Sequence, residues 1–199
     1  MKLYYAPGAC SLADHIALHE AGLKFECVKV DLKARRTENG DDFAEINPKG
    51  YVPALEFDDG QTLTENIAIL SWIADQAPDL ALHGPLGRYR LLETLAFIST
   101  EIHKAFKPFF AANATDADKA AAGEQIGKRL KLIADNLQGD FLLANKMSVA
   151  DAYLFVMLMW ATKNRLTIPD PLPAYAARLR TREAVRRALE HEGLGQPVS

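Results

Sequence analysis

The sequence has only two cysteines, and this scarcity excludes a fold stapled together by disulfide bonds. No cluster of cysteine and histidine has the spacing of a zinc site, so we predict no metal. Long apolar runs are missing too. A helix needs about 20 residues to cross a bilayer, and the longest apolar run, residues 152–161, instead predicts a buried helix and no membrane partner.

Long runs of one charge are also missing. No stretch of lysine and arginine exceeds two residues and the net charge is -3, which argues against a nucleic-acid partner. The apolar segment at residues 3–7 is too short for a secretory signal and predicts a cytoplasmic protein. With 49% hydrophobic and 25% charged residues, the 199-residue chain has the composition of a globular protein.

The first 80 residues alternate between strand and helix signals. Strands are predicted at residues 2–5, 25–32, 52–57 and 62–63, and helices at residues 11–21, 41–46 and 65–76. The turn at residues 58–60, Asp-Asp-Gly, predicts a hairpin between the last two strands. This order predicts a small mixed sheet with a right-handed parallel crossover.

A segment rich in proline and glycine, residues 77–87, separates this part from an entirely helical remainder. Apolar residues at three- and four-residue spacing predict one long helix over residues 91–109. Further helices are predicted at residues 117–137, 149–163, 172–180 and 183–192. We therefore predict an α/β domain at residues 1–80 and an all-α domain at residues 87–199.

Cys10 lies where the first strand passes into the first helix. Backbone N–H groups and the dipole at a helix start stabilise a thiolate, so this position predicts a lowered thiol pKa. The alternative is a small apolar residue that fills space. Residues 10–13 (Cys-Ser-Leu-Ala) lack the second thiol of a dithiol oxidoreductase, and Cys27, in the middle of a strand, is predicted to be structural.

Two segments of the first domain could bind a peptide. Pro53 begins a strand, and if the Val52–Pro53 bond is cis, the backbone of Val52 faces outward to pair with an extended peptide; trans is equally open. Thr64, Glu65 and Asn66 open a helix whose N–H groups could take a carboxylate while Glu65 takes an ammonium. The alternative is a plain helix cap supplied by Thr64.

Two segments of the second domain also stand out. Ser148 and Asp151 form a capping-box pattern before the apolar run, so Asp151 is predicted to be structural, with a cap worth about 0.5–2 kcal/mol. His103, in the long helix, is predicted from the residues alone to be a surface or satisfied helical histidine.

Together these segments resemble the glutathione S-transferase family, in its bacterial beta class, over essentially the whole chain. The resemblance rests on residues 2–11, 38–40, 47–50, 52–55, 63–66, 100–104 and 148–154. It implies a thioredoxin-like N-terminal domain and a helical-bundle C-terminal domain. It also implies a homodimeric enzyme that conjugates glutathione, its co-substrate, to hydrophobic electrophilic small molecules, with no further cofactor.

The resemblance also implies a site. Cys10 would lie near the glutathione sulfur, and His103 would face it and donate a hydrogen bond to the sulfur when the imidazole is charged. Ser11 is the second catalytic candidate, and the hydroxyls of Tyr4 and Tyr5 compete with them. The implied glutathione contacts are Cys10, Arg35, Tyr51, Val52, Pro53, Glu65, Asn66, Thr100, Glu101, Ile102, His103 and Lys104. Arg35 replaces a lysine common in the class, and Ala96 replaces an asparagine that often reaches the partner subunit's glutathione.

Other activities stay open at this level. Cys10 could act through a mixed disulfide in a glutathione-dependent thiol-disulfide reductase or peroxidase. A non-catalytic ligand binder is disfavoured by the retained Cys10 and by the pair Glu65 and Asn66. We expect the electrophile between residues 7–9 and the aromatic side chains Phe106, Phe109 and Phe110, which could equally be core.

Overall fold

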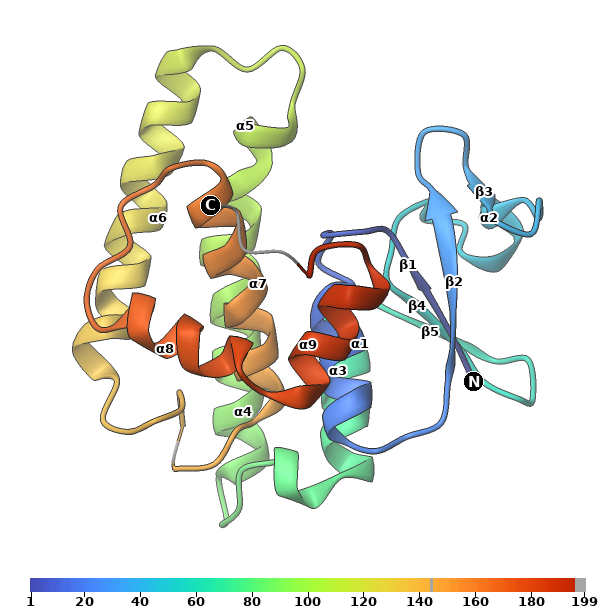
Figure 1. Ribbon diagram of the computed structural model, residues 1–199, viewed down its shortest axis with the longest axis horizontal. Helices are drawn as coiled ribbons and strands as arrows, with labels where there is room; N and C mark the ends of the chain where they lie inside the picture. Colours follow the sequence, from blue (N-terminus) through green and yellow to red (C-terminus); the bar gives the residue numbers. More distant parts are fainter. Residues whose placement is uncertain (144, 196–199) are drawn as a thin grey trace.

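The computed structural model describes residues 1–143 and 145–195, and a mixed sheet forms one side of it while helices form the other (Figure 1). The strand order is β3-β2-β1-β4-β5. The strands are β1 (Lys2–Tyr5), β2 (Glu26–Asp31), β3 (Arg36–Thr37), β4 (Ala54–Glu56) and β5 (Thr62–Thr64). β1 pairs in parallel with β2, and the other pairs are antiparallel, which confirms the predicted parallel crossover.

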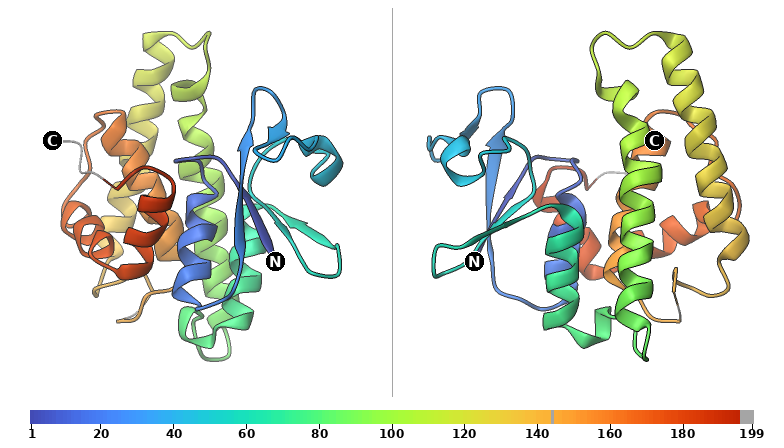
Figure 2. Two further views of the ribbon diagram at one scale, coloured as in Figure 1. Left: turned by 45° about the vertical axis from the view of Figure 1, so that its right-hand side comes forward. Right: turned by 180° about the vertical axis from the view of Figure 1, so that it is seen from behind.

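Helices cover both faces of this sheet (Figure 2). They are α1 (Leu12–Glu20), α2 (Phe43–Ile46) and α3 (Asn66–Gln76). Because side chains alternate along a strand, Leu3 packs into the core shared with α1 and α3, while Tyr4 packs on the opposite face against Phe43 of α2. The arrangement is thioredoxin-like, as the resemblance implies.

The rest of the chain is helical. Its elements are η1 (Pro78–Leu80), α4 (Gly87–Phe97), η2 (Ile98–His103), η3 (Lys104–Phe106), α5 (Lys107–Phe110), α6 (Asp116–Asn136), α7 (Val149–Lys163), α8 (Leu172–Arg180) and α9 (Glu183–His191). α7 is the buried helix that the apolar run predicts, and α1 packs against α7 and α9. Within residues 1–143 and 145–195, every helix is too short or too polar to span a bilayer. The domain limits at 80 and 87 stay predictions.

The capping box that begins α7 is confirmed. Asp151 accepts hydrogen bonds from the backbone N–H of Ser148 at 2.8 Å and from its hydroxyl at 2.7 Å. The carboxylate also accepts from the N–H of Leu142 at 2.8 Å and from the hydroxyl of Tyr175 at 2.7 Å. Asp151 therefore joins the start of α7 both to the preceding loop and to α8.

The long helix predicted over residues 91–109 is present as an unbroken run of helical segments, but its hydrogen bonding changes along its length. α4 gives way to a π-helical segment, η2, in which the N–H of Lys104 bonds to the carbonyl of Ser99 five residues earlier. A 3-10 turn, η3, follows before α5. Pro108 accounts for the second break, because it has no N–H to donate to the carbonyl four residues earlier.

Candidate active site

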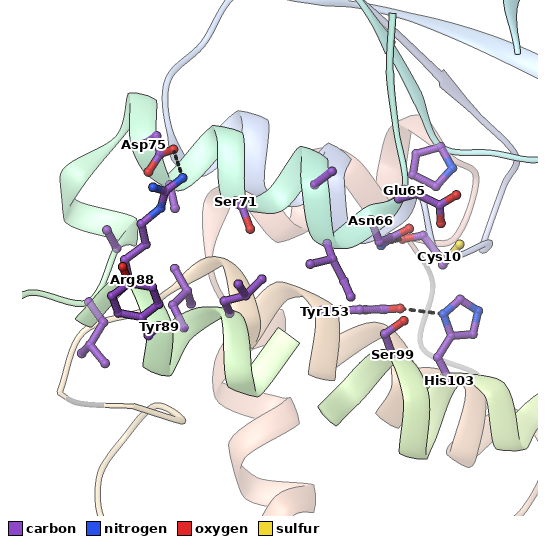
Figure 3. Close-up of a pocket in the computed structure, with 18 of the residues that line it drawn as sticks. Cys10, Glu65, Asn66, Ser71, Asp75, Arg88, Tyr89, Ser99, His103 and Tyr153 are labelled. Atoms are coloured by element: carbon purple, nitrogen blue, oxygen red, sulfur yellow. Dashed lines mark hydrogen bonds and ion pairs between the residues drawn. The ribbon is translucent and has the colours of Figure 1, made fainter. Parts of the chain in front are cut away.

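A cavity of about 860 Å³ lies between the domains, along α3 and α4 (Figure 3). The chemically active side chains gather at one end: Cys10, Tyr51, Glu65, Asn66, Ser99, His103 and Tyr153, beside the backbone of Val52 and Pro53. At the other end Arg88 and Asp75 form an ion pair at 3.2 Å next to Tyr89 and Leu92. The first end can therefore hold a polar ligand, and the second adds apolar surface from Tyr89 and Leu92 beside the ion pair.

The loop that carries Cys10 is fixed from within the first domain. The Cys10 thiol donates to the carbonyl of Val52 at 3.6 Å, and the side-chain amide of Asn66 donates to the carbonyl of Cys10 at 3.0 Å. The Val52–Pro53 peptide bond is cis, which answers the question that the sequence left open. The start of α3 and the segment before β4 thus position the thiol together.

The expected low pKa of Cys10 is wrong. Burial raises the pKa of the thiol to about 12, and the carboxyl of Asp14 acts in the same direction. The N–H groups at the helix start, those of Cys10 and Ser11, lower the pKa as expected, but they offset only part of the cost of burying a charge. Cys10 is therefore a neutral thiol at pH 7 in the ligand-free protein.

Glu65 lies at the mouth of the cavity as an acceptor. It receives hydrogen bonds from the ammonium of Lys49 and from the hydroxyl of Tyr51, both at 2.6 Å. These bonds lower the pKa of the carboxyl and keep it charged. Its φ is +76°, a conformation that non-glycine residues rarely adopt and that is common at functional sites.

The start of α3 is left open by this geometry. The alternative prediction, a helix cap supplied by Thr64, is wrong, because Glu65 occupies the N-cap position. The side chain of Glu65 makes no capping hydrogen bond. The first N–H groups of α3 are therefore available to an anion.

His103 faces the cavity from η2, and its Nδ1 lies 2.6 Å from the hydroxyl of Tyr153 on α7. Burial lowers the pKa of the imidazole, which favours its neutral form. The expectation that His103 would act as a charged donor is therefore corrected. Ser99, one turn earlier, hydrogen-bonds to the same tyrosine hydroxyl and lowers its pKa, whereas burial raises it more.

Two family models match this chain. The model of the glutathione S-transferase N-terminal domain matches residues 9–76, and that of the C-terminal domain matches residues 97–182. A relative from Escherichia coli O157:H7, Glutathione S-transferase GstA, is 42% identical over 98% of this chain and 100% of its own length. The chain belongs to the glutathione S-transferase family.

Solved structures indicate the class to which this transferase is similar. A sphingomonad glutathione S-transferase complexed with glutathione is 51% identical, with a TM-score of 0.90, over 98% of this chain and 100% of that one. A bacterial beta class enzyme from Sphingomonas chungbukensis is 48% identical, with a TM-score of 0.89 and the same coverage. The resemblance to the beta class and the transferase activity it implies are confirmed.

Several predicted site residues of the transferase lie away from the cavity. Ser11 is completely buried, and its hydroxyl lies within hydrogen-bond distance of the backbone of Ala6. The hydroxyl of Tyr4 donates to Glu56, and Tyr5 packs against two histidines of α1 and α9. Arg35 is exposed in the turn between β2 and β3. None of these side chains lines the described cavity.

The segment at residues 100–104 contributes only His103. Thr100 donates to the carbonyl of Ala96, Glu101 pairs with Arg129 at 2.7 Å, Ile102 is in the core and Lys104 is exposed. Only one face of a helix can line the cavity, so the side chains of the other four residues in this segment point away from it.

Phe106, Phe109 and Phe110, the aromatic side chains expected beside the electrophile, lie outside the lining of the described cavity. Phe106 is buried in the core, and Phe110 is exposed and packs against Trp160 with ring centroids 4.8 Å apart. Phe109 lies near Phe106 and is half-buried. The described cavity extends along α3 and α4 and has none of the three in its walls.

The sequence reading missed four residues that shape the site. Tyr153 and Lys49 lie within two segments of the resemblance, residues 148–154 and 47–50, but the apolar run predicts a core tyrosine and nothing local gives Lys49 a partner. Ser99 lies outside these segments. The fourth is Glu192, one of whose carboxylate oxygens accepts from the N–H of Gly8 at 2.8 Å. Its other oxygen lies 2.9 Å from Nδ1 of His15, and the indole of Trp160 donates to the carbonyl of Gly8 at 2.8 Å. The second domain therefore holds both polar groups of Gly8.

Proposed function

We propose that this transferase binds glutathione at the Cys10 end of the cavity and transfers it to hydrophobic electrophiles. The observation that carries the proposal is the convergence of Val52, Glu65, the open start of α3 and His103 in one cavity. In the reaction, the sulfur of glutathione gives up its proton to solvent and attacks an electrophilic carbon. A carbon–sulfur bond forms, and the leaving group departs with its electron pair. Removal of a reactive electrophile is a detoxifying reaction.

The γ-glutamyl end of glutathione carries both an ammonium and a carboxylate. We assign the ammonium to Glu65, which is charged, and the carboxylate to the free N–H groups at the start of α3. Lys49 adds a positive charge beside Glu65. The backbone of Val52 pairs with the peptide groups of the tripeptide.

The reactive sulfur would be stabilised as a thiolate by the imidazole of His103. When the hydroxyl of Tyr153 donates to Nδ1, the neutral ring carries its proton on Nε2 and can donate it into the cavity. This tautomer is assigned from the hydrogen-bond network. Tyr153 is then a positioning residue, because it sets which nitrogen of His103 is the donor.

The proposal includes a homodimer. Leu86, Tyr89 and Leu92, on α4 and just before it, are 58%, 66% and 44% exposed beside the far end of the cavity. A second copy would remove this apolar surface from water. We also propose a cytoplasmic location, since Cys10 and Cys27 are both free thiols. Gel filtration and cell fractionation test the two statements.

Glu65→Ala should raise the KM for glutathione roughly 10- to 150-fold with little change in kcat. The reason is that an ammonium left without its carboxylate costs about 1.5–3 kcal/mol. Steady-state kinetics with an aryl halide measures this. Glu124→Ala, which removes an exposed carboxylate of α6, is the matched control and should leave KM unchanged. A KM for Glu65→Ala within twofold of wild type would refute the assignment.

Cys10→Ala should keep conjugation within about tenfold of wild type, because a thiol with a pKa of about 12 is not a nucleophile at pH 7. After incubation with oxidised glutathione, intact-protein mass spectrometry should show an adduct that forms slowly, faster at higher pH, and is absent from Cys10→Ala. An adduct that survives Cys10→Ala but is lost in Cys27→Ala contradicts the placement. Loss of conjugation by 100-fold or more in Cys10→Ala would favour covalent chemistry at Cys10.

A further inference from the structure

A second cluster of reactive side chains lies outside the cavity, where α1, β2 and α9 meet. His15, Cys27 and His191 each bring one candidate ligand atom to within 4.8 Å of the other two. Nε2 of His15 is 3.4 Å from the sulfur of Cys27. The rings of His15 and His191 are perpendicular, with centroids 5.2 Å apart. No part of the proposed function uses this cluster.

We propose that His15, Cys27 and His191 form a site for a borderline-soft divalent metal ion of the Zn²⁺ type. Two imidazole nitrogens and one thiolate are ligands that such ions prefer over Mg²⁺ or Ca²⁺. Bond lengths of about 2.0–2.1 Å to nitrogen and about 2.3 Å to sulfur place tetrahedral ligand atoms roughly 3.5 Å apart. The observed separation of 3.4 Å between His15 and Cys27 therefore already suits a shared ion.

Glu192 orients the imidazole of His15 as a metal ligand. Because the Glu192 carboxylate offers acceptors, Nδ1 of His15, 2.9 Å away, carries the proton, and Nε2 presents its lone pair toward Cys27. A carboxylate behind a histidine is the usual arrangement that orients a metal ligand and increases its basicity. His15 and the side chain of Glu192 are fully buried, so this orientation is held by packing as well.

The cluster also has an entry path. His15 is buried, Cys27 is half-buried and His191 is exposed, so an ion can approach from the His191 side and keep water as its fourth ligand. Binding displaces the thiol proton of Cys27 to solvent and leaves the ion bonded to a thiolate. The three ligands come from three separate elements, which is why no short spacing in the sequence reveals them.

Co²⁺ titration of chelator-treated protein tests the proposal. We expect one equivalent to bind with thiolate-to-cobalt absorption in the near ultraviolet and the visible bands of a tetrahedral site, and Zn²⁺ to displace it. Cys27→Ser should abolish the near-ultraviolet band and weaken binding by at least about 100-fold, and His191→Ala should weaken it by at least about 10-fold. Zn²⁺ should also raise the melting temperature of wild type by mass action.

Two matched variants control for thiols and histidines elsewhere. Cys10→Ser and His83→Ala, the latter an exposed histidine outside the cluster, should bind Co²⁺ like wild type. Far-ultraviolet circular dichroism establishes that each variant is folded. Absence of binding at millimolar Co²⁺, a spectrum unchanged by Cys27→Ser, or binding lost in Cys10→Ser would overturn the proposal. Because the readout is metal binding, the result is independent of transferase activity.

Discussion

Asp151→Ala should lower the free energy of unfolding by at least about 3 kcal/mol. The carboxylate is completely buried and accepts four hydrogen bonds, from Leu142, from both donors of Ser148 and from Tyr175. Alanine leaves these donors unpaired in the interior, at a cost of about 1–3 kcal/mol for each one that water cannot reach. Urea unfolding followed by circular dichroism measures the loss.

The chain contains its own control for this experiment. α6 begins with a second capping box, in which the exposed Asp118 accepts from the N–H and hydroxyl of Thr115. Asp118→Ala removes the same local motif without tertiary partners, so it should cost only about 0.5–2 kcal/mol. Equal losses for the two variants would show that the bonds from Leu142 and Tyr175 add nothing to the cap.

Asp151 illustrates which contacts can be predicted from the sequence and which cannot. The capping box of α7 could be predicted because it is a local pattern, and its structural role is confirmed. The hydrogen bond from Tyr175 to Asp151 could not be predicted, because Tyr175 lies on a different helix, α8. The same holds for the long helix over residues 91–109, where apolar spacing does not distinguish α from π hydrogen bonding. The fold itself followed from strand alternation, the linker and the ordered motifs of the resemblance.

The position of Cys10 was predictable from the sequence, and its electrostatics were not. Cys10 does lie at a helix start and in the cavity, but its neighbours bury it, and burial outweighs the helix dipole in setting the pKa. Lys49 meets Glu65 only because the turn before β4 folds against the start of α3. Local spacing cannot report contacts of this kind, since both depend on chain segments that come together in the tertiary fold.

The longest-range contact of the site predicts the second large effect. Glu192→Ala should lower the free energy of unfolding by about 2–5 kcal/mol, because it leaves His15 and the N–H of Gly8 without their buried acceptor. Gly8 has a φ of +70° and lies in the turn that presents Cys10, so the turn loses one of its two anchors to the second domain. We therefore also expect the KM for glutathione to rise severalfold in the fraction that stays folded.

Glu192→Gln separates this positioning role from a general loss of packing. Glutamine keeps the shape and one oxygen acceptor, so it should recover part of the stability and part of the KM, whereas Glu190→Ala, which removes an exposed carboxylate of α9, should change neither. Thermal unfolding and steady-state kinetics, both in excess chelator, exclude any contribution from a bound metal. If Glu192→Ala loses stability but keeps the wild-type KM, the Trp160 bond alone fixes the Gly8 turn, and Glu192 serves only to satisfy His15.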